Sequence, residues 1–309
     1  MERVVITGAT GMIGAALTRA CVEAGVRVVA VVRPGSVRLG RLPPSPLVQV
    51  VECALMELNR LPERMTGSAD AFFHLGWGHT GPAKFDSILY QTENINATLH
   101  ALTAAKQLGC GVFIGTGSQA EYGPLDLERI GPDSPCSPAL AYGICKYAAG
   151  KLALLEGERL DLPVAWVRVF SVYGPNDKPT TMIASAVSRM LAGERVAFTP
   201  GQQLWDYLYC DDAARALFLL GQRGGGAGGV HCLGSGEARP LAEYIREIAE
   251  ATGYRLPLQI GALPYAPNQV MRLCADISSL TRETGFVPAV SFEEGIRRTV
   301  AAARRNADG

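Results

Sequence analysis

Short apolar runs rich in β-branched residues recur along the first half of the chain and predict buried strands. Five of these runs lie at 4–7, 27–33, 48–52, 69–76 and 111–115. Before the last of them, apolar residues recur with helical spacing over 94–108, and Gly109 follows as a stop signal. Strands that alternate with helices are typical of an α/β fold with a doubly wound parallel sheet, whose ligands lie beyond the carboxyl ends of the strands.

The second half of the chain predicts a smaller α/β lobe. Helical spacing marks 241–252 and 292–303, and 176–195 is expected to be a loop followed by a helix. The apolar run 230–233 is expected to return to the main sheet. No repeat or disordered linker separates the two halves, so we expect them to share an interface and a cleft.

Composition argues against several classes of partner. The chain has 29 basic and 29 acidic side chains, so no excess charge favours nucleic acid or an anionic membrane surface. No apolar run approaches the roughly 20 residues that a membrane span needs, and no charged-then-apolar leader is present. The eight cysteines are scattered without a C-x-x-C pair, as reduced thiols are, and no metal site is predicted. We expect a soluble cytoplasmic protein.

A glycine-rich turn follows the first predicted strand, with glycines at 8, 11 and 14, and helical spacing resumes directly afterwards. In a dinucleotide site, the first glycine permits the tight turn and the second lets the backbone approach a pyrophosphate. The third lets the helix pack closely on the strand. The free N–H groups at the start of the helix then bind the phosphates. The alternative is an ordinary strand-turn-helix unit with glycines by chance.

The second predicted strand does not end in the acidic residue that holds the ribose hydroxyls in NAD sites. Residues 26–51 contain no carboxylate and four arginines, namely Arg27, Arg33, Arg38 and Arg41. Guanidinium groups pair bidentately with phosphate, so this stretch favours NADP over NAD, with Arg33 and Arg38 at the 2′-phosphate. The alternative is a solvated basic loop.

Three residues form a candidate acid-base set. Ser118 follows the fifth predicted strand, and Tyr142 and Lys146 lie four residues apart in a predicted helix, on one face and one turn apart. A nearby ammonium is expected to lower the pKa of the phenol from about 10 toward neutrality, where general acid-base catalysis works best. The alternative is a chance Y-x-x-x-K pattern, with His74 expected to be structural in either case.

Six segments of the chain together resemble one enzyme family. They lie at 7–14, 73–75, 118–123, 142–146, 168–175 and 205–212. In family order, they resemble the extended short-chain dehydrogenases/reductases of the NAD(P)-dependent sugar-nucleotide epimerase/dehydratase family. The resemblance implies a Rossmann-type doubly wound parallel sheet that binds NAD(P), and a smaller C-terminal α/β lobe that binds a nucleotide-diphosphate sugar. The NAD(P)-binding domain is expected at 1–170 with a return segment at about 206–235, and the substrate-binding lobe at 171–205 and 236–309.

The resemblance also assigns site residues. The catalytic set is Ser118, Tyr142 and Lys146. The expected cofactor contacts are Thr7, Gly8, Thr10, Gly11, Met12, Ile13, Gly14, Arg33, Arg38, Leu75, Gly76, Tyr142 and Lys146. The expected substrate contacts are Trp77, His79, Ser118, Gln119, Phe198 and Arg272, although a core position for Phe198 is an open alternative. A homodimer is implied, formed through the helices at 94–108 and 142–156.

Departures from the family pattern narrow the predicted activity. The dehydratases of this family follow their serine or threonine with an Asp-Glu pair, and Gln119 and Ala120 stand in those positions here. Glu121 lies one residue further, where an extended backbone would turn its side chain to the other face. Trp205 stands where the family has an arginine that binds the diphosphate. Without that charge, a smaller carbonyl substrate is an open alternative to a nucleotide sugar.

Simple hydride transfer remains. We predict an NADPH-dependent reductase that acts on a keto group of a nucleotide-linked sugar, with a 4-keto-6-deoxy sugar as the substrate. An NAD-dependent nucleotide-sugar 4-epimerase is the alternative. Two further hypotheses stay open. In the first, Cys145 or His79 takes the place of the cysteine and histidine of the 3,5-epimerising reductases. In the second, the chain is a binding protein that senses the NADP/NADPH ratio and catalyses no reaction.

Overall fold

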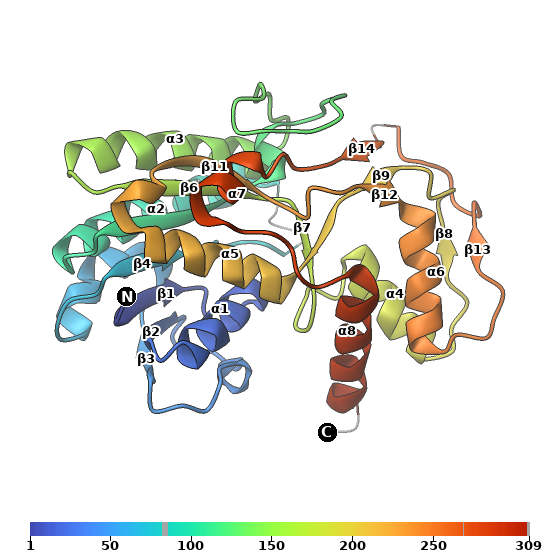
Figure 1. Cartoon of the computed structure of the whole chain (residues 1–309), viewed down its shortest axis with the longest axis horizontal. Helices are drawn as coiled ribbons and strands as arrows, with labels where there is room; N and C mark the ends of the chain where they lie inside the picture. The colour runs from blue at the N-terminus through green and yellow to red at the C-terminus, as the bar shows by residue number, and fades with distance from the viewer. Residues whose placement is uncertain (82–85, 268, 308–309) are drawn as a thin grey trace.

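The computed structural model describes residues 1–81, 86–267 and 269–307, and its centre is a seven-stranded parallel sheet (Figure 1). The strand order is β11-β6-β5-β4-β1-β2-β3. The bounds are β1 (Arg3–Thr7), β2 (Arg27–Val32), β3 (Val48–Glu52), β4 (Ala71–His74), β5 (Val112–Ser118), β6 (Val164–Val169) and β11 (Gly229–Leu233). The chain winds outward from β1 in one direction and from β4 in the other, so the predicted doubly wound sheet is confirmed. The order reverses between β1 and β4, where such folds bind their ligands.

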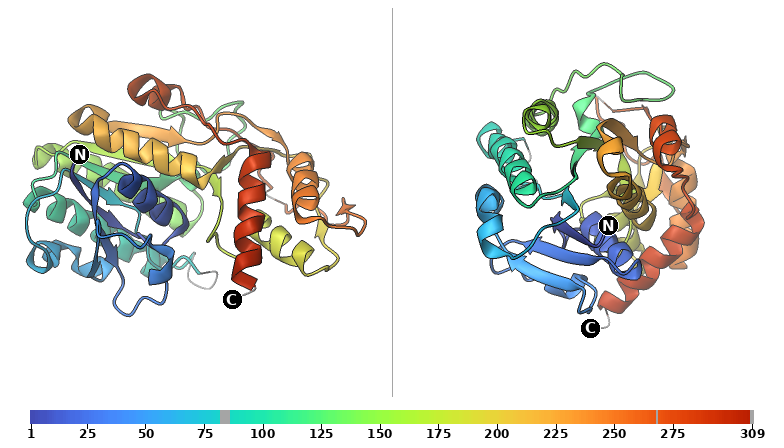
Figure 2. Two further views of the ribbon diagram at one scale, coloured as in Figure 1. Left: turned by 60° about the horizontal axis from the view of Figure 1, so that its bottom comes forward. Right: turned by 60° about the vertical axis from the view of Figure 1, so that its left-hand side comes forward.

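Alternation along the strands explains how both faces of the sheet are covered. Val4 and Ile6 of β1 belong to one buried cluster, with the helices α1 (Met12–Glu23) and α5 (Cys210–Arg223). Val5 belongs to the other cluster, with α2 (Ile88–Gln107) and α3 (Ala141–Arg159). Successive side chains of a strand point to opposite faces, so an uninterrupted apolar run fits a sheet buried on both sides. Figure 2 shows these helices on the two sides of the sheet.

The helix α2 begins six residues earlier than the apolar spacing predicted. Its first turn contains Ile88 and Leu89, which are 70 % and 80 % exposed. These residues do not face the core, so they do not continue the core-facing pattern that the sequence shows from Ile95 onward. The predicted helix at 241–252 and the return of 230–233 to the sheet agree with the structure.

The C-terminal lobe is built from helices and short strands (Figure 1). Its helices are α4 (Met182–Leu191), α6 (Leu241–Thr252) and α8 (Phe292–Ala307). The helix α7 (Ser278–Thr284) instead lies against α5 and β11 of the main sheet, although it falls within the segment 236–309 that was expected to belong to the lobe. Its strands are β8 (Ala197–Phe198), β9 (Leu204–Trp205), β12 (Arg239–Pro240), β13 (Gln259–Ile260) and β14 (Arg272–Leu273). Two further strands, β7 (Ser171–Tyr173) and β10 (Tyr207–Tyr209), pair in parallel as a separate small sheet. None of the helices in the described part of the chain is long and apolar enough to cross a membrane.

Aromatic rings join the lobe to the sheet. The Phe292 ring lies 4.9 Å from Tyr173 and 4.5 Å from Tyr244, measured between ring centroids. Tyr207 lies 5.1 Å from Tyr244 with its ring nearly perpendicular, an arrangement that aromatic pairs prefer. One buried cluster runs from β1 through α5 into α6. The shared interface expected from the sequence is therefore present.

Candidate active site

The glycine-rich turn between β1 and α1 has the shape that a pyrophosphate needs. Gly8 adopts φ +66°, and a Cβ placed on it would lie 2.8 Å from the backbone nitrogen of Gly76. A Cβ on Gly14 would overlap the Gly8 carbonyl oxygen. Gly11 caps α1 without any side-chain hydrogen bond, so the first N–H groups of the helix are left for a ligand. The cradle fits a dinucleotide, with Thr10, Gly11, Met12 and Ile13 along it.

Thr7 supports this turn from within the protein. Its hydroxyl shares a hydrogen bond of 2.9 Å with Nδ1 of His74 and accepts the Gly76 N–H at 3.1 Å. Thr7 is completely buried, so its side chain holds the Leu75–Gly76 backbone beside the turn. Burial and the charge of Lys146 lower the pKa of His74 to about 3, which keeps this imidazole neutral. His74 is structural, as the sequence suggested.

The arginines after β2 occupy different places. Arg27 lies at the start of the strand, where its guanidinium is 3.8 Å from Glu2, and it takes no part in the site. Arg33 and Arg38 are exposed beyond the end of the strand. Arg41, which the sequence did not assign to the site, donates to the Thr10 carbonyl at 3.4 Å. Its pKa is lowered by burial and by the charge of Arg38, so the two cations are close. The sequence signal that could have identified Arg41 is its position in the stretch 26–51, which contains no carboxylate.

The structure brings Ser118, Tyr142 and Lys146 together at the carboxyl end of β5. The Ser118 hydroxyl forms a hydrogen bond with the Tyr142 phenol. The Lys146 ammonium donates to the Thr116 carbonyl at 2.6 Å. Its Nζ lies 3.8 Å from the centroid of the Trp77 ring and 6.0 Å from that of Tyr142. Because β5 and the first turns of α3 meet here, residues far apart in the sequence converge as the spacing predicted.

The expected lowering of the Tyr142 pKa is wrong in direction. Burial raises the pKa of Tyr142, the hydrogen bond from Ser118 opposes the rise, and the charge of Glu121 adds to it. Burial lowers the pKa of Lys146 to about 7, against the opposing effect of Glu121. The helical spacing placed both side chains on one face, but the ammonium turns toward Thr116 and Trp77. The phenol is therefore a protonated acid in this state.

Two further residues expected at the substrate lie in the loop after β4. Trp77 packs edge-on to Tyr142, with ring centroids 6.0 Å apart, and its indole N–H donates to Gln91 Oε1 at 2.9 Å. His79 adopts φ +57° and lies against α2, with Nε2 2.9 Å from Glu93 Oε2. Trp77 thus contacts the catalytic set directly. Gln119, in the turn η4 (Gln119–Glu121), is partly exposed beside Ser118.

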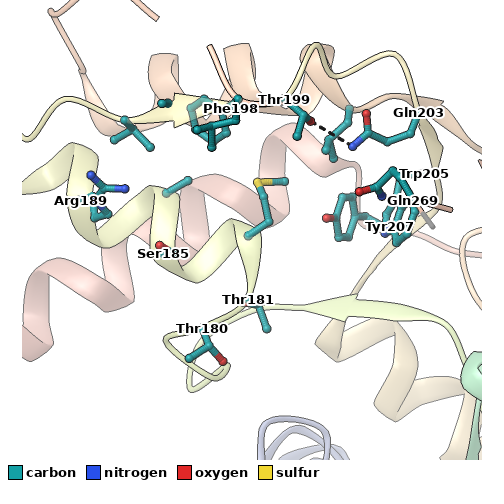
Figure 3. A pocket seen from close by; sticks show the side chains of 16 residues that line it. Thr180, Thr181, Ser185, Arg189, Phe198, Thr199, Gln203, Trp205, Tyr207 and Gln269 are labelled. Atoms are coloured by element: carbon teal, nitrogen blue, oxygen red, sulfur yellow. Dashed lines mark hydrogen bonds between the residues drawn. The ribbon is translucent and has the colours of Figure 1, made fainter. Parts of the chain in front are cut away.

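The C-terminal lobe contains a pocket of about 390 Å³ between α4 and β8 (Figure 3). Side chains that line it include Thr181, Arg189, Phe198, Gln203, Trp205 and Tyr207. Phe198 borders this pocket, but it is only 8 % exposed and belongs to the large buried cluster, so the core position left open by the sequence is present as well. Arg272 does not line this pocket among the described residues, although its strand β14 pairs with β9. The Arg189 guanidinium is bound to Glu194 at 2.8 Å. In the described residues no cluster of histidine, cysteine or carboxylate side chains could hold a metal ion.

Comparison with known proteins assigns this site to a family. The profile of the NAD dependent epimerase/dehydratase family matches residues 4–232. The chain belongs to this family. It is therefore an enzyme of oxidoreductase type with a nicotinamide cofactor, as its motifs indicated. The chain is 27 % identical to a dTDP-glucose 4,6-dehydratase of Streptomyces griseus, in an alignment that covers 77 % of this chain and 73 % of that relative.

Solved structures of similar fold include two sugar-nucleotide complexes. The fold matches UDP-N-acetylglucosamine 4-epimerase from Methanobrevibacter ruminantium M1, in complex with UDP-N-acetylmuramic acid, with a TM-score of 0.88 and 23 % identity over 99 % of both chains. It matches MoeE5, in complex with UDP-glucuronic acid and NAD, with a TM-score of 0.83 and 28 % identity, over 99 % of this chain and 100 % of that one.

Proposed function

We propose that this enzyme transfers hydride from NADPH to a keto carbon of a nucleotide-linked sugar, with C4 of a 4-keto-6-deoxy sugar as the acceptor. The observation that carries the proposal is the half-buried Tyr142 phenol at the carboxyl end of β5, hydrogen-bonded to Ser118 and kept protonated because desolvation raises its pKa. Reduction of a ketone needs an acid beside the carbonyl oxygen, and a phenol with a raised pKa holds that proton.

Each residue of the set has one task in this reaction. Ser118 donates a hydrogen bond to the keto oxygen, and Tyr142 delivers the proton to it. Lys146 lies one helical turn from Tyr142, where its charge stabilises the phenolate that remains after the proton has been delivered. NADPH, when bound, supplies the hydride. Trp77 covers Lys146 and keeps water from the ammonium.

Dehydration is disfavoured by the surroundings of Ser118. Gln119 and Ala120 provide no carboxylate for an elimination, and the Glu121 carboxylate points away from the cleft into an ion pair with Arg168 at 2.8 Å. The likeness to dTDP-glucose 4,6-dehydratases therefore supports the substrate class rather than the reaction.

The pocket of the C-terminal lobe supports a nucleotide as the part of the substrate that this lobe binds. Phe198, Trp205 and Tyr207 give it aromatic walls against which a base can stack. Trp205 donates its indole N–H to Ser171 at 2.8 Å, so its ring is fixed where the family pattern has an arginine. We propose that the pocket holds the base mainly by stacking.

A 4-epimerase is the second candidate, because it uses the same Ser118, Tyr142 and Lys146 set and MoeE5 was solved with NAD. One experiment separates the two candidates. The purified enzyme is offered nucleotide-linked keto sugars with NADPH or NADH, and UDP-hexoses without added cofactor. Oxidation of NADPH by a keto sugar supports the reductase. Stoichiometric bound NAD with interconversion of UDP-hexoses supports the epimerase and contradicts the reductase.

NADPH preference is proposed to depend on Arg41 together with Arg38. Replacing Arg41 with alanine is expected to raise KM for NADPH by about 10–100-fold, because a charge-assisted hydrogen bond is worth about 1.5–3 kcal/mol. KM for NADH should change little. Arg27→Ala, at the opposite end of β2, is the matched control and should leave both values unchanged. Equal increases in KM for NADPH and NADH in R41A would contradict a role for Arg41 in 2′-phosphate recognition.

A homodimer is proposed through the outer faces of α2 and α3. Ile144, Leu152 and Leu155 lie on one exposed side of α3, and Ile88 and Leu89 are exposed on α2. Apolar patches of this kind mark interfaces. Sedimentation velocity is expected to show a dimer for the native chain and a monomer for L152E/L155E. Val287→Glu changes an exposed apolar residue beside α5, on the other side of the sheet from α2 and α3, and should leave the dimer intact. A native monomer would contradict the proposal.

A further inference from the structure

Glu121 places a fully buried carboxylate directly behind the serine of the active site. Its side chain has no exposed surface, and that of Arg168 is 5 % exposed. Arg168 Nε donates to Glu121 Oε2 at 2.8 Å, and Trp166 Nε1 donates to Oε1 at 3.1 Å. The remaining contact is to the backbone: the Ser118 N–H donates to Glu121 Oε1 at 2.8 Å. The carboxylate thus joins the end of β5 to two side chains of β6.

The surrounding chain leaves room for this group. A Cβ on Gly117 would overlap Glu121 Oε1, and a Cβ on Gly150 of α3 would lie 2.5 Å from Trp166 Nε1. The Arg168 guanidinium also donates to the Pro132 carbonyl at 3.0 Å and lies 4.6 Å from the centroid of the Tyr122 ring. Every donor around the carboxylate therefore has a fixed direction.

Stability alone does not account for such a pair. Removing two charges from water costs free energy that their attraction barely repays, and apolar pairs of similar volume are commonly as stable. What this pair does provide is a fixed Ser118. The Ser118 hydroxyl accepts the Ala120 N–H at 3.2 Å while Glu121 accepts the Ser118 N–H, so the two residues hold each other in a capping box.

We propose that Glu121 is a positioning residue of the active site, whose carboxylate fixes the Ser118 backbone so that its hydroxyl meets Tyr142. The negative charge of Glu121 also opposes the lowering of the Lys146 pKa by burial, which gives the proposal a second readout. The groups that face Lys146 are Glu121 from η4, Tyr142 from α3, His74 from β4 and Lys178 from the loop before α4. His74 is neutral and Lys178 is cationic, so Glu121 is the group that favours the ammonium. The activity part of this inference rests on the proposed reductase function.

Glu121→Gln tests the proposal, because it removes the charge and leaves one acceptor oxygen where the carboxylate has two, so the Ser118 N–H and Arg168 Nε can no longer both be accepted. Titration of Lys146 is followed by NMR of isotope-labelled lysine side chains, with K146M identifying the signal, and it needs no substrate. In E121Q the Lys146 pKa is expected to fall below its value of about 7. In keto-sugar reduction, kcat is expected to fall about 10–100-fold, the cost of a misplaced reacting group, with KM for NADPH unchanged.

Two further variants keep the test decisive. E121Q/R168Q removes both charges and avoids a buried, unpartnered guanidinium, so it is used if E121Q does not fold. Asp212→Asn removes another buried carboxylate, which accepts the Ala289 and Val290 N–H groups far from the site, and should leave the Lys146 pKa and kcat unchanged. An unchanged Lys146 pKa in folded E121Q, or an unchanged kcat, overturns the inference. If the native enzyme reduces no keto sugar, the proposed function fails, and the NMR titration still decides the role of Glu121.

Discussion

Tyr142→Phe is expected to lower kcat for keto-sugar reduction by about 10²–10⁴-fold, the usual contribution of a positioned general acid. The substitution removes one hydroxyl and keeps the ring that packs against Trp77, so the fold should be preserved. The structure places the phenol beside Ser118, and its raised pKa keeps it protonated at neutral pH, as the proposed proton donor must be. Steady-state kinetics with NADPH measures the loss, and fluorescence titration should show NADPH binding within about twofold of the native enzyme, as fits a group needed only in the transition state.

Tyr254→Phe provides the matched control for this substitution. Its hydroxyl donates to the Glu194 carbonyl at 2.9 Å in the C-terminal lobe, far from β5. Losing it should cost about 0.5–1.5 kcal/mol of unfolding free energy at most and leave kcat unchanged. Native kcat in Y142F would contradict the assignment of the acid. A parallel loss of NADPH binding would instead show that Tyr142 serves mainly to hold the cofactor.

The parts of the site that the sequence predicted are those governed by local spacing. Gly8 and Gly11 lie in the turn before α1 and Gly14 lies in its first turn, while Tyr142 and Lys146 lie one turn apart on α3. Helical period and steric freedom therefore define their geometry. The doubly wound sheet followed from apolar runs alternating with helices. In each case the information lies within about fifteen residues of chain, which is the range over which pattern and propensity act.

What the sequence could not predict depends on contacts between distant segments. Trp77 covers Lys146 only because the loop after β4 folds against α3. Arg41 donates to the Thr10 carbonyl. The sequence does not reveal this contact, because Arg41 and Thr10 are far apart in the chain. The direction of the Tyr142 pKa was wrong because burial depends on everything packed around the phenol, while the spacing of Lys146 specifies only one neighbour. Electrostatics of a buried group therefore needs the assembled site.

The glycine turn yields the second large expected effect, on both stability and cofactor binding. Gly8→Ala adds a Cβ that would lie 2.8 Å from the Gly76 nitrogen, on a backbone with φ +66°. Overpacking against rigid backbone costs about 1–3 kcal/mol, and the left-handed conformation adds about 1–2 kcal/mol for a residue with a Cβ. The displaced Leu75–Gly76 segment borders the cofactor cradle, so Kd for NADPH is expected to rise at least about tenfold, since each 1.4 kcal/mol is tenfold in affinity. Urea unfolding and NADPH titration measure the two effects.

Gly25→Ala separates close contact from backbone strain. Gly25 adopts φ +74°, almost the conformation of Gly8, but nothing lies within 4 Å of a Cβ added there. It should therefore lose only the conformational contribution of about 1–2 kcal/mol and bind NADPH normally. The difference between the two variants is the free energy of the contact between the first turn and the end of β4. Equal destabilisation of G8A and G25A, with native NADPH binding in both, would mean that the turn tolerates a side chain and is not shaped around a pyrophosphate.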